Sequence, residues 1–360
     1  MKRFTAVLAA LCLLLTGCAD GAIRRLAGAG YDFDYTVENT TGSTVVNVYN
    51  WGEYMDEDLN KAFEKVTGIK VNYDTFQTNE MLYSTLKSGG SSYDVIIPSD
   101  YMAGRLIEED MLLELDFANI PNFSNVDPQF INPPYDPQNR YTVPYLWGTV
   151  GIIYDTAKTA APVDSWDALF DPQYQGQILM FDNSRDALGI ALKALGHSYN
   201  TTGEDELRAA YDLLAAQRPL VQAYVMDQIF DKMEGGEAIL APYYAGDALA
   251  MMEANADLAF AVPKEGSNIF TDAFCVPKGA ANKAAAELYI DFMCGYNAGS
   301  ANAEAVGYST PLLDVYAGLD PAVRDDGISY PADFSLFEAY ANLPRETRDL
   351  YDKLWTDLLR

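Results

Sequence analysis

The chain has very little histidine, cysteine or positive charge, and each shortage removes a class of function. His197 is the only histidine among 360 residues, so a site with several histidine ligands or a serine–histidine relay lacks its side chains. The 24 basic residues are outnumbered by 52 acidic ones, which gives a formal charge of −28. Because nucleic-acid binding needs a basic surface, we expect no nucleic-acid partner. A Gly-x-Ser-x-Gly motif, a phosphate-binding loop and metal-ligand spacing are also missing, so nothing indicates an enzyme, a metal or a cofactor.

The overall composition is that of a folded protein with more than one lobe. Hydrophobic residues make up 49% of the chain and charged residues 21%, which excludes a largely disordered chain. Because 360 residues exceed one comfortable hydrophobic core, we expect two lobes.

The N-terminus predicts export from the cytoplasm. Lys2 and Arg3 precede an apolar run at residues 4–15 that is too short to span a membrane, and residues 15–18 read Leu-Thr-Gly-Cys. That tetrapeptide resembles the bacterial lipobox, in which the cysteine becomes the lipidated first residue; the alternative is a plain signal peptide with an incidental cysteine. We predict a signal peptide at 1–17, lipidation of Cys18 and a flexible tether at 18–43. The protein would then lie outside the cytoplasm, attached to a membrane by lipid alone.

Cleavage after residue 17 would leave two cysteines in the body of the protein. Cys275 follows a strand-like residue and Cys294 lies in an apolar helical segment. A disulfide and two buried free thiols both remain open, so we predict no bridge. Removing Lys2 and Arg3 would leave 22 basic and 52 acidic residues, a formal charge of −30.

The body alternates strand and helix patterns, which predicts an α/β fold with mostly parallel sheets. Residues 44–49 are β-branched like a buried strand, apolar residues at helical spacing follow as far as Gly68, and residues 69–73 alternate like a strand. Ligands of such sheets collect at the carboxyl ends of the strands. Further strands are expected at 94–98, 150–154, 177–181, 237–241, 258–262 and 272–276, and helices at 78–86, 187–195, 205–216 and 283–294.

Aromatic and acidic side chains come together directly after or beside these strands. Aromatic faces attract cations by roughly 0.5–2 kcal/mol each, and a carboxylate that accepts from an ammonium contributes roughly 1.5–3 kcal/mol. Taken singly, each side chain could instead pack a rim or face water, and Asp186 could complement a helix macrodipole. Their clustering favours a site for a slender molecule with separated positive charges. The residues are Trp51, Glu53, Ser99, Tyr101, Asp186, Tyr244, Asp247, Phe270 and Asp272.

Six short motifs resemble the polyamine-binding proteins of bacterial ABC importers. Residues 50–54 (Asn-Trp-Gly-Glu-Tyr) are similar to the opening motif of that family, and residues 95–101 and 144–148 to its second and third motifs. Further similarities lie at residues 165–169, 263–266 and 307–311. The resemblance implies a type II periplasmic-binding-protein fold, in which each lobe is a mostly parallel sheet flanked by helices and the ligand, putrescine or spermidine, lies in the cleft.

The same resemblance implies the domain organisation and the partners. Lobe 1 would hold residues 44–147 and 268–315, and lobe 2 residues 148–267 and 316–360. The hinge would lie near Trp147 and Ser267, and closure would bury the ligand. The protein would act as a monomer that delivers its ligand to an ABC permease and, through it, to ATPase subunits.

The resemblance also implies roles for individual side chains. Aromatic residues would stack along the methylene chain or line it, and carboxylates and a hydroxyl would hold its charged ends. Asp247 matches an aspartate of the putrescine-selective relatives, whereas Gly52 and Asn183 lack the hydroxyl and the carboxylate found in spermidine binders. The residues expected along the methylene chain of the ligand are Trp51, Tyr244, Phe270, Tyr101 and Tyr308. Those expected at its charged ends are Asp272, Asp186, Ser99, Glu53 and Asp247.

Other functions compete with this interpretation. The adjacent Tyr243 and Tyr244 could bind ferric iron as phenolates, and aromatic residues also stack on sugars. Glu53 and Asp272 could in principle act as a general acid and base. A tethered sensor that binds a polyamine without transporting it is also compatible with the sequence.

Overall fold

The computed structural model describes residues 25–26, 30–31, 33–89, 92–160 and 162–360. The predicted signal peptide and Cys18 lie outside these residues, so cleavage and lipidation stay predictions. Two short strands, β1 (Arg25–Leu26) and β2 (Gly30–Tyr31), pair near the described start of the chain. Tyr31 and Phe33 are buried, and the Phe33 ring lies 5.7 Å from Phe292, so this part of the predicted tether packs on the body. Within the described ranges, no helix has the length and apolar character needed to cross a membrane.

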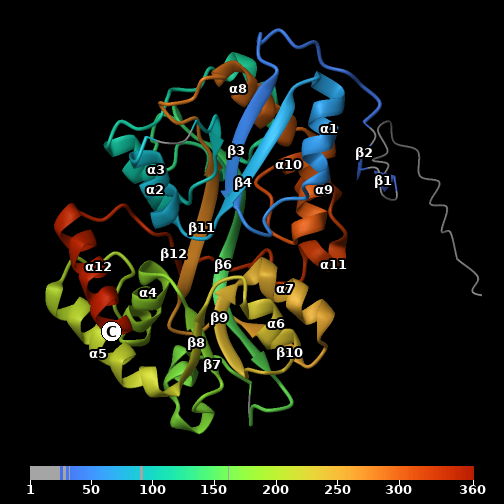
Figure 1. The fold of residues 1–360 in the computed structure, drawn as a ribbon. Coiled ribbons are helices and arrows are strands. Elements are labelled where there is room, and N and C mark those ends of the chain that lie inside the picture. The colour runs from blue at the N-terminus through green and yellow to red at the C-terminus, as the bar shows by residue number, and fades with distance from the viewer. Residues whose placement is uncertain (1–24, 27–29, 32, 90–91, 161) are drawn as a thin grey trace, which may run out of the picture.

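The upper lobe in Figure 1 is built on three parallel strands in the order β4-β3-β5. These are β3 (Val45–Trp51), β4 (Lys70–Phe76) and β5 (Val95–Ile96). The predicted β-α-β unit is confirmed, because β3 and β4 run parallel with a helix between them. The helices of this lobe are α1 (Asp58–Thr67), α2 (Asn79–Lys87), α3 (Asp100–Glu108), α8 (Lys283–Met293), α9 (Tyr296–Val306), α10 (Leu313–Gly318) and α11 (Pro321–Arg324).

Local sequence explains where these helices begin and end. Leu59, Phe63 and Val66 recur at helical spacing and bury one face of α1. The helix stops at Gly68, which adopts φ 73° and returns its N–H to the Glu64 carbonyl, a conformation that glycine adopts without strain. At the start of α2, the Thr78 side chain accepts from the backbone N–H of Met81.

A second, mixed sheet forms the lower lobe and reaches into the upper one. Its order is β12-β11-β6-β9-β7-β8, and β10 also pairs with β6. Strand β6 pairs antiparallel with β9, β10 and β11, whereas β7 pairs parallel with β8 and β9. The strands are β6 (Val143–Asp155), β7 (Ile178–Phe181), β8 (Val221–Val225), β9 (Leu240–Tyr244), β10 (Leu258–Ala261), β11 (Ser267–Phe274) and β12 (Phe337–Glu338).

Helices cover this second sheet, and the C-terminal helix belongs to it. Helix α12 packs against α4 and α5, although the chain reaches it directly from the upper lobe. The predicted α/β fold with helix-flanked sheets in two lobes is confirmed, and the exact lobe boundaries stay a prediction. The lower sheet is mixed and not mostly parallel as predicted, because β6 pairs antiparallel with three strands. The helices are α4 (Ser184–Ala194), α5 (Glu204–Gln217), α6 (Ile229–Glu234), α7 (Ala245–Ala254) and α12 (Arg345–Leu359).

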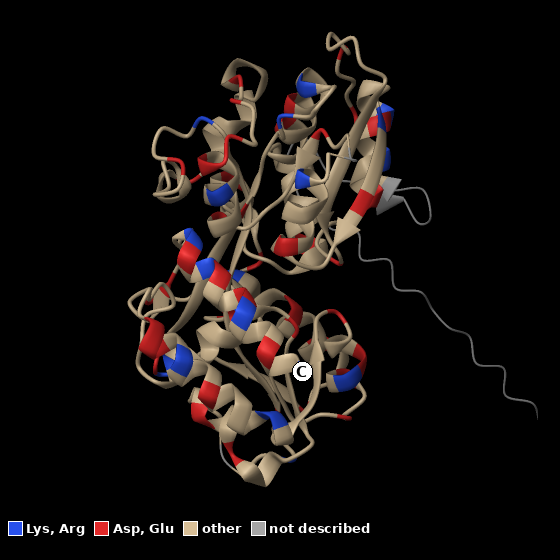
Figure 2. Ribbon diagram, turned by 60° about the vertical axis from the view of Figure 1, so that its left-hand side comes forward, with Lys and Arg blue, Asp and Glu red and all other residues tan. Residues whose placement is uncertain are grey.

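Strands β6 and β11 run through both lobes side by side (Figure 1). All residues of β6 are buried, and isolated bridges join Ile96 to Cys275 and Ser99 to Asp272. The carboxyl end of β5 therefore meets β11 at the junction of the lobes. Cys275 and Cys294 are both buried and free. Acidic residues are distributed over the helices of both lobes (Figure 2).

Candidate ligand-binding site between the lobes

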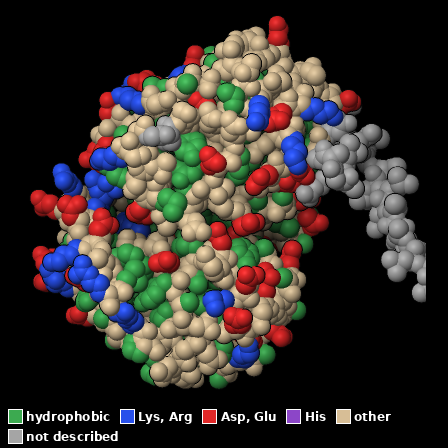
Figure 3. Space-filling view, viewed as in Figure 1, with side chains coloured by type: hydrophobic (Ala, Val, Ile, Leu, Met, Phe, Trp, Pro, Cys, Tyr) green, Lys and Arg blue, Asp and Glu red, His purple; other side chains and the backbone are tan. Residues whose placement is uncertain are grey.

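A cavity lies at the junction of the lobes, where several strands of both sheets end. It encloses about 820 Å³ not filled by protein, counting the part that opens to solvent, and acidic side chains gather along this junction on the face seen in Figure 3. The structure brings all ten residues predicted from the sequence to this cavity. They are Trp51, Glu53, Ser99, Tyr101, Asp186, Tyr244, Asp247, Phe270, Asp272 and Tyr308.

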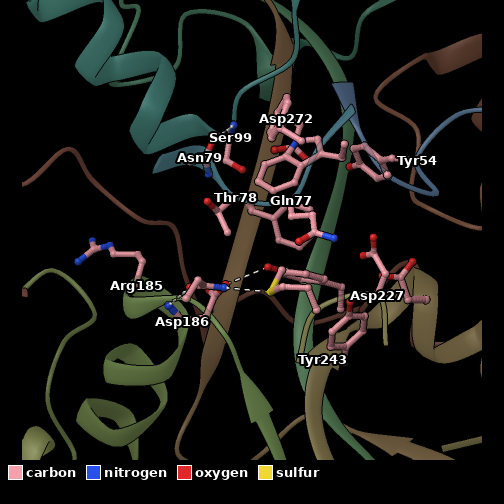
Figure 4. A pocket seen from close by; sticks show the side chains of 18 of the residues that line it. Tyr54, Gln77, Thr78, Asn79, Ser99, Arg185, Asp186, Asp227, Tyr243 and Asp272 are labelled. Atoms are coloured by element: carbon pink, nitrogen blue, oxygen red, sulfur yellow. Dashed lines mark hydrogen bonds between the residues drawn. The ribbon is translucent and has the colours of Figure 1, made fainter. Parts of the chain in front are cut away.

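Asp272 is a buried carboxylate with an unused oxygen. It lies on β11, its side chain is near Ser99 in Figure 4, and it is only 3% exposed. Among the described residues, its Oδ1 has no hydrogen-bond donor, and the buried hydroxyl of Tyr54 has no partner either. Burial raises the pKa of Asp272 to about 7, although the nearby hydroxyls of Ser99 and Tyr54 act in the opposite direction. A cationic donor in the cavity would remove this desolvation cost.

Asp186 is held rigidly in the first turn of α4. Its Oδ2 accepts from Asn183 Nδ2 at 2.8 Å and from the Tyr244 hydroxyl at 2.9 Å, and its Oδ1 accepts from the Tyr340 hydroxyl at 2.9 Å. Burial raises the pKa of Asp186, while these three donors and the Arg185 charge oppose that shift. Four lone-pair positions leave room for one more donor, so Asp186 can still meet an ammonium.

Three further carboxylates lie at another part of the cavity. Glu53 follows β3 in a turn with φ 47°, Asp227 lies between β8 and α6, and Asp247 is in the first turn of α7. Burial raises the pKa of Asp247 to about 7, and the charges of Asp227 and Glu53 add to the shift. The pKa of Asp227 is raised by burial and then by Glu53. This region is therefore strongly negative and favours a cation.

Aromatic rings form the walls between these carboxylates. Tyr244 meets Phe270 edge to face at 5.4 Å between ring centroids, and Tyr308 meets Tyr54 edge to face at 4.6 Å. With Trp51, they line the cavity from both lobes. Such walls suit a ligand that combines methylene groups with positive charge.

Tyr101 contacts neighbouring groups at the side of the cavity nearest α12. Its hydroxyl donates to Glu80 Oε1 at 3.1 Å, and its ring meets Tyr340 edge to face at 5.9 Å. The Arg185 guanidinium lies 5.8 Å from the Tyr101 ring and extends away from Asp272 in Figure 4. Tyr101 therefore joins the two lobes at this side.

Several lining residues were not predicted from the sequence, and Tyr54, Asp227 and Tyr340 are the most informative. Tyr54 lies inside the recognised motif at residues 50–54, but nothing in the sequence assigns it a role. Asp227 follows β8, a strand that the pattern analysis did not identify. Tyr340 comes from the segment that leads to α12. A strand assignment for residues 221–225 would have brought Asp227 into the predicted set.

The chemistry of the lining favours binding over metal coordination. Tyr243 and Tyr244 both line the cavity, but burial raises the pKa of each phenol well above its usual value, which disfavours the phenolate that iron needs. Among the residues that the structure describes, no group of three or more His, Cys, Asp or Glu side chains is placed to hold a metal ion. The comparisons below give no support to the ferric alternative.

Comparison with known families and proteins finds solute-binding proteins. Residues 90–330 match the family described as bacterial extracellular solute-binding protein. The chain is 34% identical over 308 residues to the spermidine/putrescine-binding periplasmic protein of Escherichia coli K12, covering 85% of this chain and 88% of that one.

Two solved structures with related sequences have a similar fold. A candidate spermidine/putrescine ABC transporter protein of Listeria monocytogenes is similar with a TM-score of 0.86 and 38% identity, over 88% of this chain and 99% of that one. The spermidine/putrescine ABC transporter substrate-binding protein PotD of Streptococcus pneumoniae is similar with a TM-score of 0.75 and 35% identity, again over 88% and 99%.

Proposed function

The chain belongs to the bacterial extracellular solute-binding protein family, and from that premise we propose that it captures a polyamine between its lobes for an ABC importer. The observation that carries this proposal is the Asp272 carboxylate, which is 3% exposed and whose Oδ1 has no donor among the described residues. An ammonium at this position would donate to Asp272 and to the hydroxyl oxygen of Tyr54. A charge-assisted hydrogen bond of this kind contributes roughly 1.5–3 kcal/mol.

The rest of the cavity fits the remainder of such a ligand. The rings of Trp51, Tyr244 and Phe270 would cover methylene groups, and Asp186 and Asp247 would compensate a second charge. Ser99 and Glu53 would complete the polar ends, and Tyr101 and Tyr308 would line the chain. Each of these side chains lines the cavity, which supports their assignment as ligand contacts.

The surroundings of Asn183 favour a diamine over a triamine. Its Oδ1 accepts from the backbone N–H of Asp186 and its Nδ2 donates to the Asp186 carboxylate, both at 2.8 Å. Both ends of the amide are thus used inside the protein, and an amide adds no negative charge for a third ammonium. We therefore propose putrescine as the better ligand and spermidine as the weaker one.

The cellular setting follows from the family and from the N-terminus. We propose a monomer that lies outside the cytoplasm, is anchored through lipidated Cys18, and hands its ligand to a permease with attached ATPase subunits. Lobe closure by bending of β6 and β11 would bury the ligand before delivery.

Mass spectrometry of the mature N-terminus would reveal diacyl or triacyl modification of Cys18, and a mature chain without acyl groups would contradict the anchor.

Calorimetric titration of the purified protein with putrescine, spermidine and ferric citrate tests the ligand. We expect micromolar or tighter binding of putrescine, weaker binding of spermidine and none of ferric citrate. The Asp272→Asn variant should lose at least about tenfold in affinity, because it replaces a charged acceptor by a neutral one. Asp182→Asn is the matched control, since Asp182 is exposed and outside the cavity lining. Binding by Asp272→Asn as tight as wild type would place the ligand elsewhere.

A further inference from the structure

Asp227 reaches across the junction of the lobes to Gly52. Asp227 belongs to the lower lobe, between β8 and α6, whereas Gly52 follows β3 in the upper lobe. The Asp227 Oδ2 lies 2.9 Å from the position that a Cβ at residue 52 would occupy. Atoms of real side chains do not approach a Cβ this closely, so a Cβ at residue 52 would force the Asp227 carboxylate to shift.

Among the described residues, the Asp227 side chain has no cationic partner. In the described part of the chain, no lysine, arginine or histidine lies within ion-pair distance of Asp227, Glu53 or Asp247. These three carboxylates come from three different elements, the β3 turn, the loop after β8 and the start of α7. Asp227 and Glu53 line the same cavity, and the charge of Glu53 raises the pKa of Asp227, because two like charges repel unless a cation lies between them.

A second observation in the same cavity also indicates a ligand. The Tyr54 side chain is 5% exposed, lines the cavity, and its hydroxyl has no hydrogen-bond partner among the described residues. After burial, the charge of Asp272 raises the pKa of Tyr54 most, and the charges of Tyr145 and then Asp247 make smaller contributions. The unused hydroxyl therefore lies within the electrostatic reach of both carboxylates and can accept from a donor placed among them.

We infer that Asp227, whose carboxylate fits against Gly52, is a specificity-determining residue that, with Glu53 and Asp247, holds a terminal primary ammonium of the ligand. A primary ammonium carries three N–H donors, and three carboxylates on separate elements provide one acceptor for each. This inference rests on the proposed function and specifies the substrate class. The ligand must end in –NH₃⁺ at this position, because each N-methyl group removes a donor and occupies space beside a carboxylate.

A double-mutant cycle at residues 52 and 227 tests the contact directly, with putrescine as the probe in calorimetry. Asp227→Asn should weaken binding by at least about tenfold, whereas Asp231→Asn, on the exposed side of α6, should stay within about twofold. Gly52→Ala should weaken binding about fivefold by displacing the Asp227 carboxylate, but by less than about twofold when Asp227 is already alanine. Asp227→Glu keeps the charge, and thermal unfolding of each variant checks that it is folded.

Ligand analogues provide an independent measurement. Wild type should bind N,N,N′,N′-tetramethylputrescine, which has no primary ammonium at either end, at least about tenfold more weakly than putrescine, and Asp227→Asn should lose part of that discrimination. Equal binding of putrescine by Asp227→Asn and wild type, or an equal penalty of Gly52→Ala in both backgrounds, would overturn the inference while the proposed function stands. Failure of wild type to bind any diamine would overturn both.

Discussion

At the scale of single residues, the cleft contains buried carboxyl groups whose charged forms are unfavourable, and a cationic ligand can remove that cost. Asp272 and Asp247 have pKa values raised to about 7 because burial disfavours their charged forms. Near neutral pH, each is therefore a mixture of acid and carboxylate in the free protein. A bound ammonium favours the carboxylate, so ligand capture should displace protons.

This coupling predicts that acidification weakens binding. Affinity for putrescine should rise from pH 6 to pH 8, by up to about tenfold per pH unit for each proton released. Calorimetry in buffers of different ionisation enthalpy should detect net proton release near pH 7, and Asp272→Asn should reduce it. An affinity that is constant between pH 6 and pH 8 would contradict the prediction.

The same two groups have the opposite effect on the stability of the free protein. Their folded-state pKa values are raised to about 7 from a usual value of 3.8, so between these pH values the folded chain binds more protons than the unfolded chain. The free energy of unfolding therefore falls as the pH rises from about 3.8 to about 7, because the two buried carboxyls must lose their protons in the folded chain. The loss is complete above pH 7.

The sequence was informative about the cleft residues because their positions follow from a general rule. Side chains after the carboxyl ends of parallel strands meet at one edge of a sheet, so Glu53 and Ser99 could be placed together without a structure. Asp227 could not, because its approach to Gly52 depends on how closely two lobes meet. No local pattern in either segment encodes that distance.

At the scale of elements, the start of α4 combines a structural and a binding role. Asn183 caps the helix through its Oδ1 and orients Asp186 through its Nδ2. Asn183→Ala should lower the free energy of unfolding by about 1 kcal/mol and weaken putrescine binding. Asn183→Ser keeps a capping oxygen but loses the amide donor, so it should retain most of the stability and still bind weakly. Denaturant unfolding with calorimetry separates the two effects, and unchanged stability of the alanine variant would refute the cap.

The segment before α12 forms an interlobe contact with α3. Asn342 Nδ2 donates to Glu108 Oε2, and the Arg348 guanidinium lies 3.9 Å from carboxylate oxygens of Glu108 and Glu109. Because these contacts exist only when the lobes are together, they should slow opening more than they affect encounter.

Removing the charge at residue 348 should therefore change the rate of ligand release. Arg348→Gln is expected to raise the putrescine dissociation rate about two- to fivefold, the range for a partly exposed ion pair, with little change in association. Arg345→Gln is the control, since Arg345 is exposed and, among the described residues, pairs only with Asp349 on its own helix. Stopped-flow fluorescence measures both rates, and identical release from the two variants would argue against the contact.

Strand β6 shows where sequence patterns fall short at this scale. A strand was expected at residues 150–154, where Gly151 already lies, yet the structure extends it back to Val143 through Gly148 and Pro144. Proline and glycine usually interrupt strands. Here the pairing with β11 shifts register between Thr271 and Ala273, next to Pro144. Gly148 and Gly151 admit the rings of Phe270 and Phe260, which would meet a Cβ at 2.9 Å and 2.3 Å.

At the scale of the whole molecule, the formal charge of −28 should influence how fast a cation arrives. Acidic residues over both lobes create a negative potential that steers cations toward the cleft. The association rate for putrescine should fall about tenfold or less between 20 mM and 500 mM salt, while release changes little. Stopped-flow measurements across this range test the effect, and a rate insensitive to salt would show that encounter is not steered.

The path of β6 and β11 through both lobes has a consequence for how such a protein can change over evolution or in the laboratory. Because these two strands stay paired across the junction apart from one register shift between Thr271 and Ala273, exchanging a whole lobe would require a cut through paired strands. Cutting there would expose unpaired strand edges, which promote aggregation. New ligand preferences should therefore arise by replacing individual cleft side chains, and chimaeras that swap whole lobes between relatives should express poorly.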